Sequence, residues 1–195
     1  MLYHPQTDIK TAHLIGIDPG SNTLGCAVME FDVRTLLPVC IQAWTYVGER
    51  LAYSQAIASQ HGQRIARIRA LGEQLSTLYW NCEPVMVACE SPFINVRRPQ
   101  AYGALVEVVA AIRVGCIAYD PVMRFDLIDP PSVKTGVGAK GNANKDGVKH
   151  AVVTHPELGL MTDYSAMDEH SIDAVAVAYT GLQHLRLYGV QYLLY

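Results

Sequence analysis

Three acidic residues occupy positions where an ionised side chain is costly. Asp18 follows the apolar run "LIGI", Glu90 ends the run "PVMVACE", and Asp173 lies within "HSIDAVAVA". A buried carboxylate destabilises a fold unless another group compensates its charge. Neighbouring carboxylates can stay ionised together when a cation lies between them, and Mg²⁺ prefers carboxylate oxygens. The three acids therefore predict a divalent metal site if the fold brings them together, whereas Asp18 alone reads equally well as a turn residue before Pro-Gly.

The sheet expected around these acids has several short strands. The predicted strands are 13–18, 25–32, 39–47, 84–90 and 122–128. Short turns join the first three, which predicts an antiparallel meander, and the fourth is apolar enough to be buried on both faces. Ligand sites of open α/β sheets gather at strand ends. Asp18 and Glu90 lie side by side if their strands are adjacent and parallel.

Helices complete the predicted domain. The segments expected to be helical are 52–80, 98–114, 144–154 and 167–187. The sequence "DPPS" after the last strand is predicted to be a turn, and 134–147 a loop rich in Gly, Asn and Lys. This order of elements predicts a single α/β domain over residues 1–195, with a mixed β-sheet flanked by α-helices.

The last predicted helix carries further polar groups. His170 and Glu169 precede Asp173 by three and four residues, so either can share its helix face. Asp168 is predicted to cap the start of the helix, where its carboxylate can accept backbone N–H groups. The helix therefore offers the metal site one acid and one of two possible neighbours.

The composition is that of a globular protein, with 50% hydrophobic and 17% charged residues and a net charge of −3. The five cysteines are scattered and no secretion signal is recognisable, so we expect a cytoplasmic protein. Glu107 and Arg113 interrupt the apolar stretch 102–119, which argues against a membrane span. Residues 97–149 carry eight Lys or Arg against five acids, and this basic centre hints at a nucleic-acid partner.

Four motifs in order resemble a known family. They are "GIDPGSNTLG", Glu90 followed by "SPF", Lys134 with the loop "GNANKDGV", and "HSIDAVAVA". Together they resemble the RuvC Holliday-junction resolvases of the ribonuclease H-like superfamily, over roughly residues 14–182. The resemblance implies a ribonuclease H-like sheet and a homodimeric, metal-dependent endodeoxyribonuclease that nicks two strands of a four-way DNA junction.

The resemblance also implies the metal ligands. Asp18, Glu90 and Asp173 match the acids that hold two Mg²⁺ ions, for which Mn²⁺ can substitute. His170 stands where family members have a fourth acid or a histidine, and imidazole suits Mn²⁺ better than Mg²⁺. Glu169 is the alternative fourth ligand. One ion would activate a water and the other would stabilise the leaving 3′ oxygen, which gives 5′-phosphate and 3′-hydroxyl ends.

Further matches concern DNA. Phe93 matches an aromatic residue that stacks on junction bases, an interaction of about 1–3 kcal/mol per base, and its alternative is an ordinary core phenylalanine. Lys134 and Lys145 match lysines near the scissile phosphate, where they would neutralise transition-state charge, and we count Lys145 among the catalytic residues. Contacts to the DNA backbone are expected from three other basic residues: Lys140, Arg97 and Arg98.

Other functions fit the sequence less well. "GVGAKG" matches G-x-G-x-x-G but does not directly follow a strand, so we expect no nucleotide cofactor. Actin-like or sugar-kinase-like ATPases also place an Asp and glycines after a first strand, but they need two related subdomains and a longer chain. A non-catalytic scaffold would not need the three acids, and all three are present. A broader branched-DNA or flap endonuclease of the same fold stays open, as does the role of the tail "RLYGVQYLLY", which either packs on the last helix or joins a dimer surface.

Overall fold

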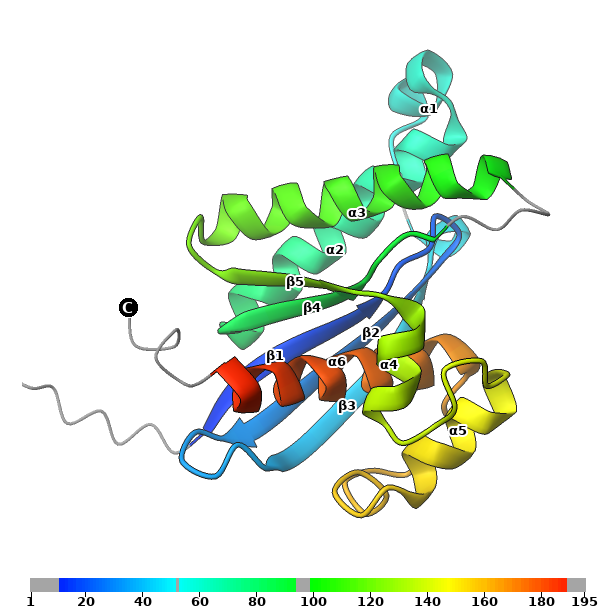
Figure 1. The fold of residues 1–195 in the computed structure, drawn as a ribbon. Helices are drawn as coiled ribbons and strands as arrows, with labels where there is room; N and C mark the ends of the chain where they lie inside the picture. Colours follow the sequence, from blue (N-terminus) through cyan, green and yellow to red (C-terminus); the bar gives the residue numbers. More distant parts are fainter. Residues whose placement is uncertain (1–10, 52, 94–98, 189–195) are drawn as a thin grey trace, which may run out of the picture.

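A five-stranded sheet runs through the computed structural model of the protein, which describes residues 11–51, 53–93 and 99–188 (Figure 1). The strands are β1 Thr11–Asp18, β2 Thr23–Asp32, β3 Pro38–Val47, β4 Met86–Glu90 and β5 Arg124–Ile128. The helices are the short η1 Gly48–Arg50, α1 Gln55–His61, α2 Gln63–Cys82, α3 Pro99–Tyr119, α4 Pro130–Gly136, α5 Lys145–Thr154 and α6 Glu169–Tyr188.

The strand order is β3-β2-β1-β4-β5, and the sheet is mixed, as predicted. The first three strands pair antiparallel as a meander, because the turns between them are too short for a crossover. Strand β4 pairs parallel with β1, and β5 pairs parallel with β4. The chain can make these parallel pairings because helices connect the strands. The carboxyl ends of β1 and β4 consequently meet at one edge of the sheet.

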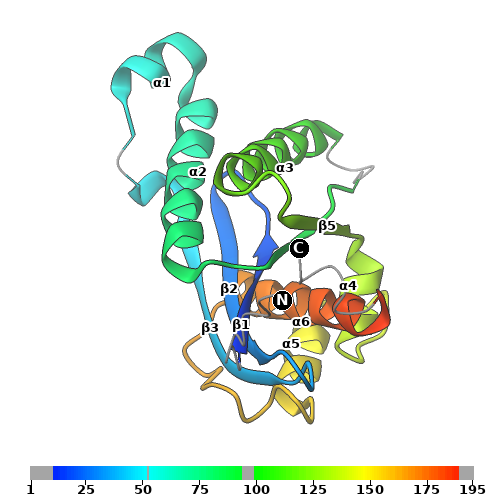
Figure 2. The same ribbon diagram turned by 90° about the vertical axis from the view of Figure 1, so that its left-hand side faces the viewer.

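Helices cover both faces of the sheet. Figures 1 and 2 show α2 and α3 on one face and α6 with α4 and α5 on the other. The pleat of each strand sends alternate side chains to the two sides. In β1, Ile15 and Ile17 belong to the hydrophobic cluster under α2 and α3, while Leu14 belongs to the cluster around α6. Asp18 lies four residues after Leu14 and therefore faces α6.

Glycines allow α6 to lie close to the sheet. A Cβ atom on Gly16 of β1 would overlap backbone atoms of Ala174 and Ala178 in α6. A Cβ on Gly25 of β2 would overlap the backbone carbonyl of His170. Both strand positions must therefore lack a side chain for the helix to sit where it does. This close contact brings the first turns of α6 to the ends of β1 and β4.

Three predicted elements need correction. The predicted helix 52–80 is two helices, α1 and α2, because Gly62 adopts a left-handed φ of 86° between them. The predicted turn "DPPS" begins α4, since the Asp129 carboxylate accepts a hydrogen bond from the Ser132 N–H and prolines suit the first helical turn. Helix α3 continues past 114 to Tyr119, because Cys116 of this last stretch is buried in the hydrophobic cluster with α2 and the sheet.

Within the described ranges, one helical stretch is long and apolar enough to cross a membrane by length and composition. It is Ala101–Tyr119 of α3, with a mean hydropathy of 1.7, and 22% of its most apolar window is buried. One such helix is weak evidence for a membrane span. Val108, Val109, Ile112 and Cys116 of this helix pack with α2 and the sheet, so α3 also serves as a helix of the protein core.

We predict that Gly16→Ala destabilises the protein by about 1–3 kcal/mol, because the added methyl group forces α6 away from β1. Chemical denaturation followed by circular dichroism measures this change. Gly72→Ala is the control: it lies within α2, where an added methyl group would meet no other atom within 4 Å, so it should stabilise the helix by up to about 1 kcal/mol. Equal effects of the two substitutions would contradict the packing argument.

Candidate active site

The ends of β1 and β4 place two carboxylates beside each other. Ile17 pairs with Cys89 in the parallel register, so Asp18 and Glu90 are the next residues on adjacent strands. Both follow an alternation that sends them to the α6 face, because Met86 and Ala88 of β4 belong to the hydrophobic cluster around α6. The sequence predicted this juxtaposition on the condition that the two strands are adjacent and parallel, and the parallel pairing of β1 with β4 meets that condition.

Helix α6 adds two further groups from its first turns. Asp173 lines the same cleft as Asp18 and Glu90, and His170 directs its Nδ1 atom to Asp18 Oδ2 at a distance of 2.8 Å. Asp168 accepts a hydrogen bond from the Ser171 N–H at 2.9 Å and thereby caps the helix start, as predicted. The three acids and His170 therefore surround one cleft of about 400 Å³.

The cleft holds more negative charge than its surroundings can stabilise. Burial raises the pKa of Glu90 to about 8, and the charges of Asp18 and Asp173 contribute to that increase. Burial also raises the pKa of Asp173 to about 6, with Asp18 as the next cause. In the absence of a cation, one carboxyl group therefore keeps its proton at neutral pH. A divalent cation would remove this conflict.

Two lysines line the other side of the cleft, and their positive charges favour the ionised form of Glu90. The Lys134 ammonium donates to the Ala143 carbonyl oxygen at 2.8 Å, which ties α4 to the loop before α5. Lys145 forms an ion pair with Glu169, with 2.6 Å between Nζ and Oε1. Both cations thus lie beside the acids, and the Lys145 pair is half-exposed and open to exchange.

The structure separates the two possible fourth ligands. His170 contacts Asp18 directly, whereas Glu169 turns to Lys145 and is not among the residues that line the cleft. The geometry therefore brings His170, and not Glu169, to the three acids.

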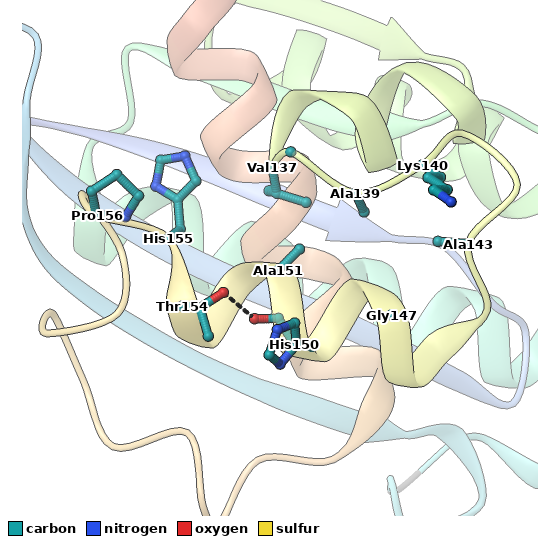
Figure 3. Close-up of a pocket in the computed structure, with 11 residues that line it drawn as sticks. Val137, Ala139, Lys140, Ala143, Gly147, His150, Ala151, Thr154, His155 and Pro156 are labelled. Atoms are coloured by element: carbon teal, nitrogen blue, oxygen red, sulfur yellow. Dashed lines mark hydrogen bonds between the residues drawn. The ribbon is translucent and has the colours of Figure 1, made fainter.

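The predicted DNA-contacting residues fall into three groups. Phe93 lines the cleft and is 52% exposed, so it is not a core residue. Lys140 lies outside the acidic cleft, in a neighbouring hollow of about 460 Å³ between the α4–α5 loop and α5 (Figure 3). That hollow is lined by Lys140, His150, His155, Thr154 and small or apolar residues, without a carboxylate. Arg97 and Arg98 lie outside the described residues.

The donor set of the cleft fits a hard divalent cation in chemistry. Carboxylate oxygens from two strands and one helix face the same space, and burial penalises their charge in the absence of a cation. Across the described parts of the chain, no three His, Cys, Asp or Glu side chains form a group close enough to count as an assembled metal site. The carboxylates and His170 therefore line one cleft without forming an assembled metal site.

Two residues that sequence reasoning missed position this site. Gly25 allows the backbone of His170 to approach β2, and Thr23 Oγ1 lies 3.0 Å from His170 Nε2. A glycine inside a strand signals close backbone approach, so the role of Gly25 had a signal in the sequence. A threonine at the start of a strand carries no such signal.

Comparison with known proteins finds relatives that share one description. No model of a protein family matches the chain. It is 28% identical over 176 residues to the crossover junction endodeoxyribonuclease RuvC of Gloeobacter violaceus, covering 88% of each chain. It is 29% identical over 173 residues to the RuvC of Neisseria gonorrhoeae, covering 87% of this chain and 84% of that protein.

Solved structures share the fold. RuvC of Thermus thermophilus, in complex with Holliday junction substrate, superposes with a TM-score of 0.67 at 21% identity, covering 91% of this chain and 96% of that one. The yeast mitochondrial Holliday junction resolvase Ydc2 gives a TM-score of 0.58 at 11% identity, covering 91% and 84% of the two chains.

A mixed sheet in the order β3-β2-β1-β4-β5, flanked by helices and similar to these structures, is a ribonuclease H-like fold. The predicted fold class is confirmed. Within this class, the resemblance to the RuvC family that the four motifs predict is confirmed by curated RuvC relatives that are 28% and 29% identical over most of the chain.

We predict that the metal-free protein loses stability as pH rises from about 4.5 to about 8. The folded state raises the pKa of Glu90 from 4.5 to about 8, so in this range it binds a proton that the unfolded chain has released. Thermal denaturation in EDTA at several pH values measures the slope. Glu90→Gln should remove much of it, and the control Glu73→Gln, on the exposed face of α2, should not. An unchanged slope in Glu90→Gln would contradict the burial of this carboxyl group.

Proposed function

We propose that the protein is a structure-specific endonuclease that resolves four-way DNA junctions by paired, symmetric nicks. The observation that carries the proposal is the cleft in which two strand-ending acids meet an acid and a histidine of α6. The chain is related over most of its length to crossover junction endodeoxyribonucleases, and a structural neighbour was solved with Holliday junction substrate. Cleavage of a phosphodiester needs positive charge beside the phosphate. The cleft supplies acids that could hold metal cations, and lysines that carry a positive charge themselves.

The residues that would hold two Mg²⁺ ions, or Mn²⁺ in their place, are Asp18, Glu90 and Asp173, with His170 as the fourth ligand. When bound, such ions supply an activated water and stabilise charge on the phosphate oxygens. The acids themselves contribute rigid placement, since Asp18 and Glu90 end buried strands and Asp173 lies on a helix packed closely against them.

The lysines act on the phosphate directly. Lys134 is fixed by the Ala143 carbonyl at 2.8 Å and presents its charge beside Glu90. Lys145 begins α5 behind the Asn144 cap and is held by an exposed ion pair with Glu169. An exposed pair is weak, so a phosphate can replace Glu169 as the partner of Lys145. Both cations would then neutralise the charge that develops on the transferred phosphoryl group.

Phe93 and the remaining basic residues would bind the DNA. The exposed ring of Phe93 lies at the rim of the cleft and is free to stack on an unpaired base. Lys140 extends the positive surface from the cleft into the adjoining hollow, where a DNA backbone phosphate could reach it. Arg97 and Arg98 are proposed as backbone contacts from the sequence alone.

A nicking assay tests the proposed function. We expect Mg²⁺- or Mn²⁺-dependent, symmetric nicks in an end-labelled four-way junction and none in a linear duplex of the same sequence. Asp18→Asn should abolish cleavage and leave junction binding equal or tighter, because it removes a metal ligand and one negative charge. Binding is measured by electrophoretic mobility shift in Ca²⁺ or EDTA.

Other outcomes would contradict parts of the proposal. Equal cleavage of flaps and forks favours the broader branched-DNA endonuclease. If no DNA is cleaved with either metal, the ATPase and scaffold functions become the favoured alternatives. Cleavage by Asp18→Asn at the wild-type rate overturns the assignment of the metal ligands.

We further propose that the enzyme is a homodimer joined through α3. The outer side of this helix carries exposed apolar or small residues at helical spacing: Tyr102, Val106, Ala110, Val114 and Ile117. Val114 and Ile117 are 65% and 55% exposed, which is unfavourable for a stripe of this length in water. A four-way junction cut symmetrically needs two active sites related by a two-fold axis, and a self-complementary helix face provides such an interface.

We predict that Val114→Lys converts the dimer to a monomer, since it places a charge within the apolar stripe. Size-exclusion chromatography with light scattering should give twice the chain mass of 21.4 kDa for wild type and the chain mass for the variant. Leu160→Lys is the control, because Leu160 is 94% exposed between α5 and α6 and lies outside the stripe. A dimeric Val114→Lys, or a monomeric wild type, would contradict the proposed interface.

A further inference from the structure

Both ring nitrogens of His170 are engaged by side chains of the sheet. Nδ1 lies 2.8 Å from Asp18 Oδ2, and Nε2 lies 3.0 Å from Thr23 Oγ1. Thr23 is the first residue of β2 and shares the α6 face with Gly25, which admits the backbone of His170. Asp18 and His170 line the cleft but Thr23 does not. The imidazole therefore turns Nδ1 to the acids and Nε2 to the hydroxyl behind it.

A threonine hydroxyl suits this position because it both donates and accepts hydrogen bonds. A neutral imidazole has one N–H and one nitrogen lone pair, and their places depend on its tautomer. When Nδ1–H donates to Asp18, the Thr23 hydroxyl can donate to the lone pair of Nε2. When the lone pair is on Nδ1, Nε2–H can donate to Thr23 Oγ1. The hydroxyl thus supports both tautomers while the ring stays in place.

We infer that Thr23 is a positioning residue that holds His170 with Nδ1 toward the acids, so that the histidine can ligate a cation through Nδ1 without turning its ring. The inference rests on the proposed function for the role of the cation. A histidine that ligates a metal almost always donates its other N–H to an oxygen, and Thr23 is the oxygen that the fold provides. Glu169 does not compete for this place, since its Oε1 is 3.7 Å from Nε2.

The test compares Thr23→Val, which keeps the shape of the side chain without the hydroxyl, with Thr23→Ser, which keeps the hydroxyl. The ¹⁵N resonances of His170 are recorded in metal-free protein at a pH where the imidazole is neutral. We expect the Nε2 resonance to move to the position of an unbonded nitrogen in Thr23→Val and to stay unchanged in Thr23→Ser. Thr45→Val is the matched control, because the Thr45 hydroxyl bonds Asp168 at the start of α6 and not His170.

Mn²⁺ binding to the same variants provides the second measurement. We expect the dissociation constant to rise about 10- to 100-fold in Thr23→Val, the range usual for loss of such a partner, and to change little in Thr23→Ser. An Nε2 resonance that is equal in wild type and Thr23→Val, or a Mn²⁺ affinity that does not change, would overturn the inference. Absence of Mn²⁺ binding by wild type would contradict the proposed function instead, and the Nε2 resonance would still decide whether Thr23 holds the ring.

Discussion

The contact between α6 and the sheet is the constraint on which the active site depends. Gly16 and Gly25 leave no side chain between the helix and strands β1 and β2, so backbone approaches backbone. Gly181 likewise allows close approach farther along α6, where a Cβ atom would meet the side chain of Ala88 in β4. The distance of the helix from the sheet and its rotation about its own axis are consequently fixed. Its first turns therefore place His170 and Asp173 at the strand ends. Without this contact the acids would still end their strands, but they would lack the third carboxylate.

The same packing creates an electrostatic conflict. Fixing carboxylates in a partly buried cleft raises the pKa of Glu90 and of Asp173, so the site is destabilised while it is empty of cations. His170 relieves part of this by its contact with Asp18, and two lysines relieve more. The conflict is useful for a phosphodiesterase, because a site that lowers its own free energy by taking up divalent cations also prepares them for a phosphate. Stability and function therefore make opposite demands on the same three acids.

Much of this arrangement is predictable from the sequence, and the reasons are local. Runs of apolar residues that end in Asp18 and Glu90 mark buried strands, and strand ends of α/β sheets hold ligands. Asp173 lies within an apolar helix that has to face the core. Other features depend on longer-range packing or on small local choices. The left-handed Gly62 divides one amphipathic pattern into two helices, and the Asp129 cap with its prolines turns an apparent loop into α4. The role of Thr23 could not be predicted, because it depends on a contact with His170, which lies 147 residues away along the chain.

The central claim is that Asp18, Glu90 and Asp173 form a divalent cation site. Anomalous X-ray diffraction from crystals grown with Mn²⁺ tests it most directly. The account predicts Mn²⁺ peaks bounded by these three carboxylates, with His170 Nδ1 turned toward one of them, and no such peaks in Asp18→Asn crystals grown in the same way. Mn²⁺ bound elsewhere, with the acidic cleft free of anomalous density and Asp18 still bonded to His170, would contradict the account.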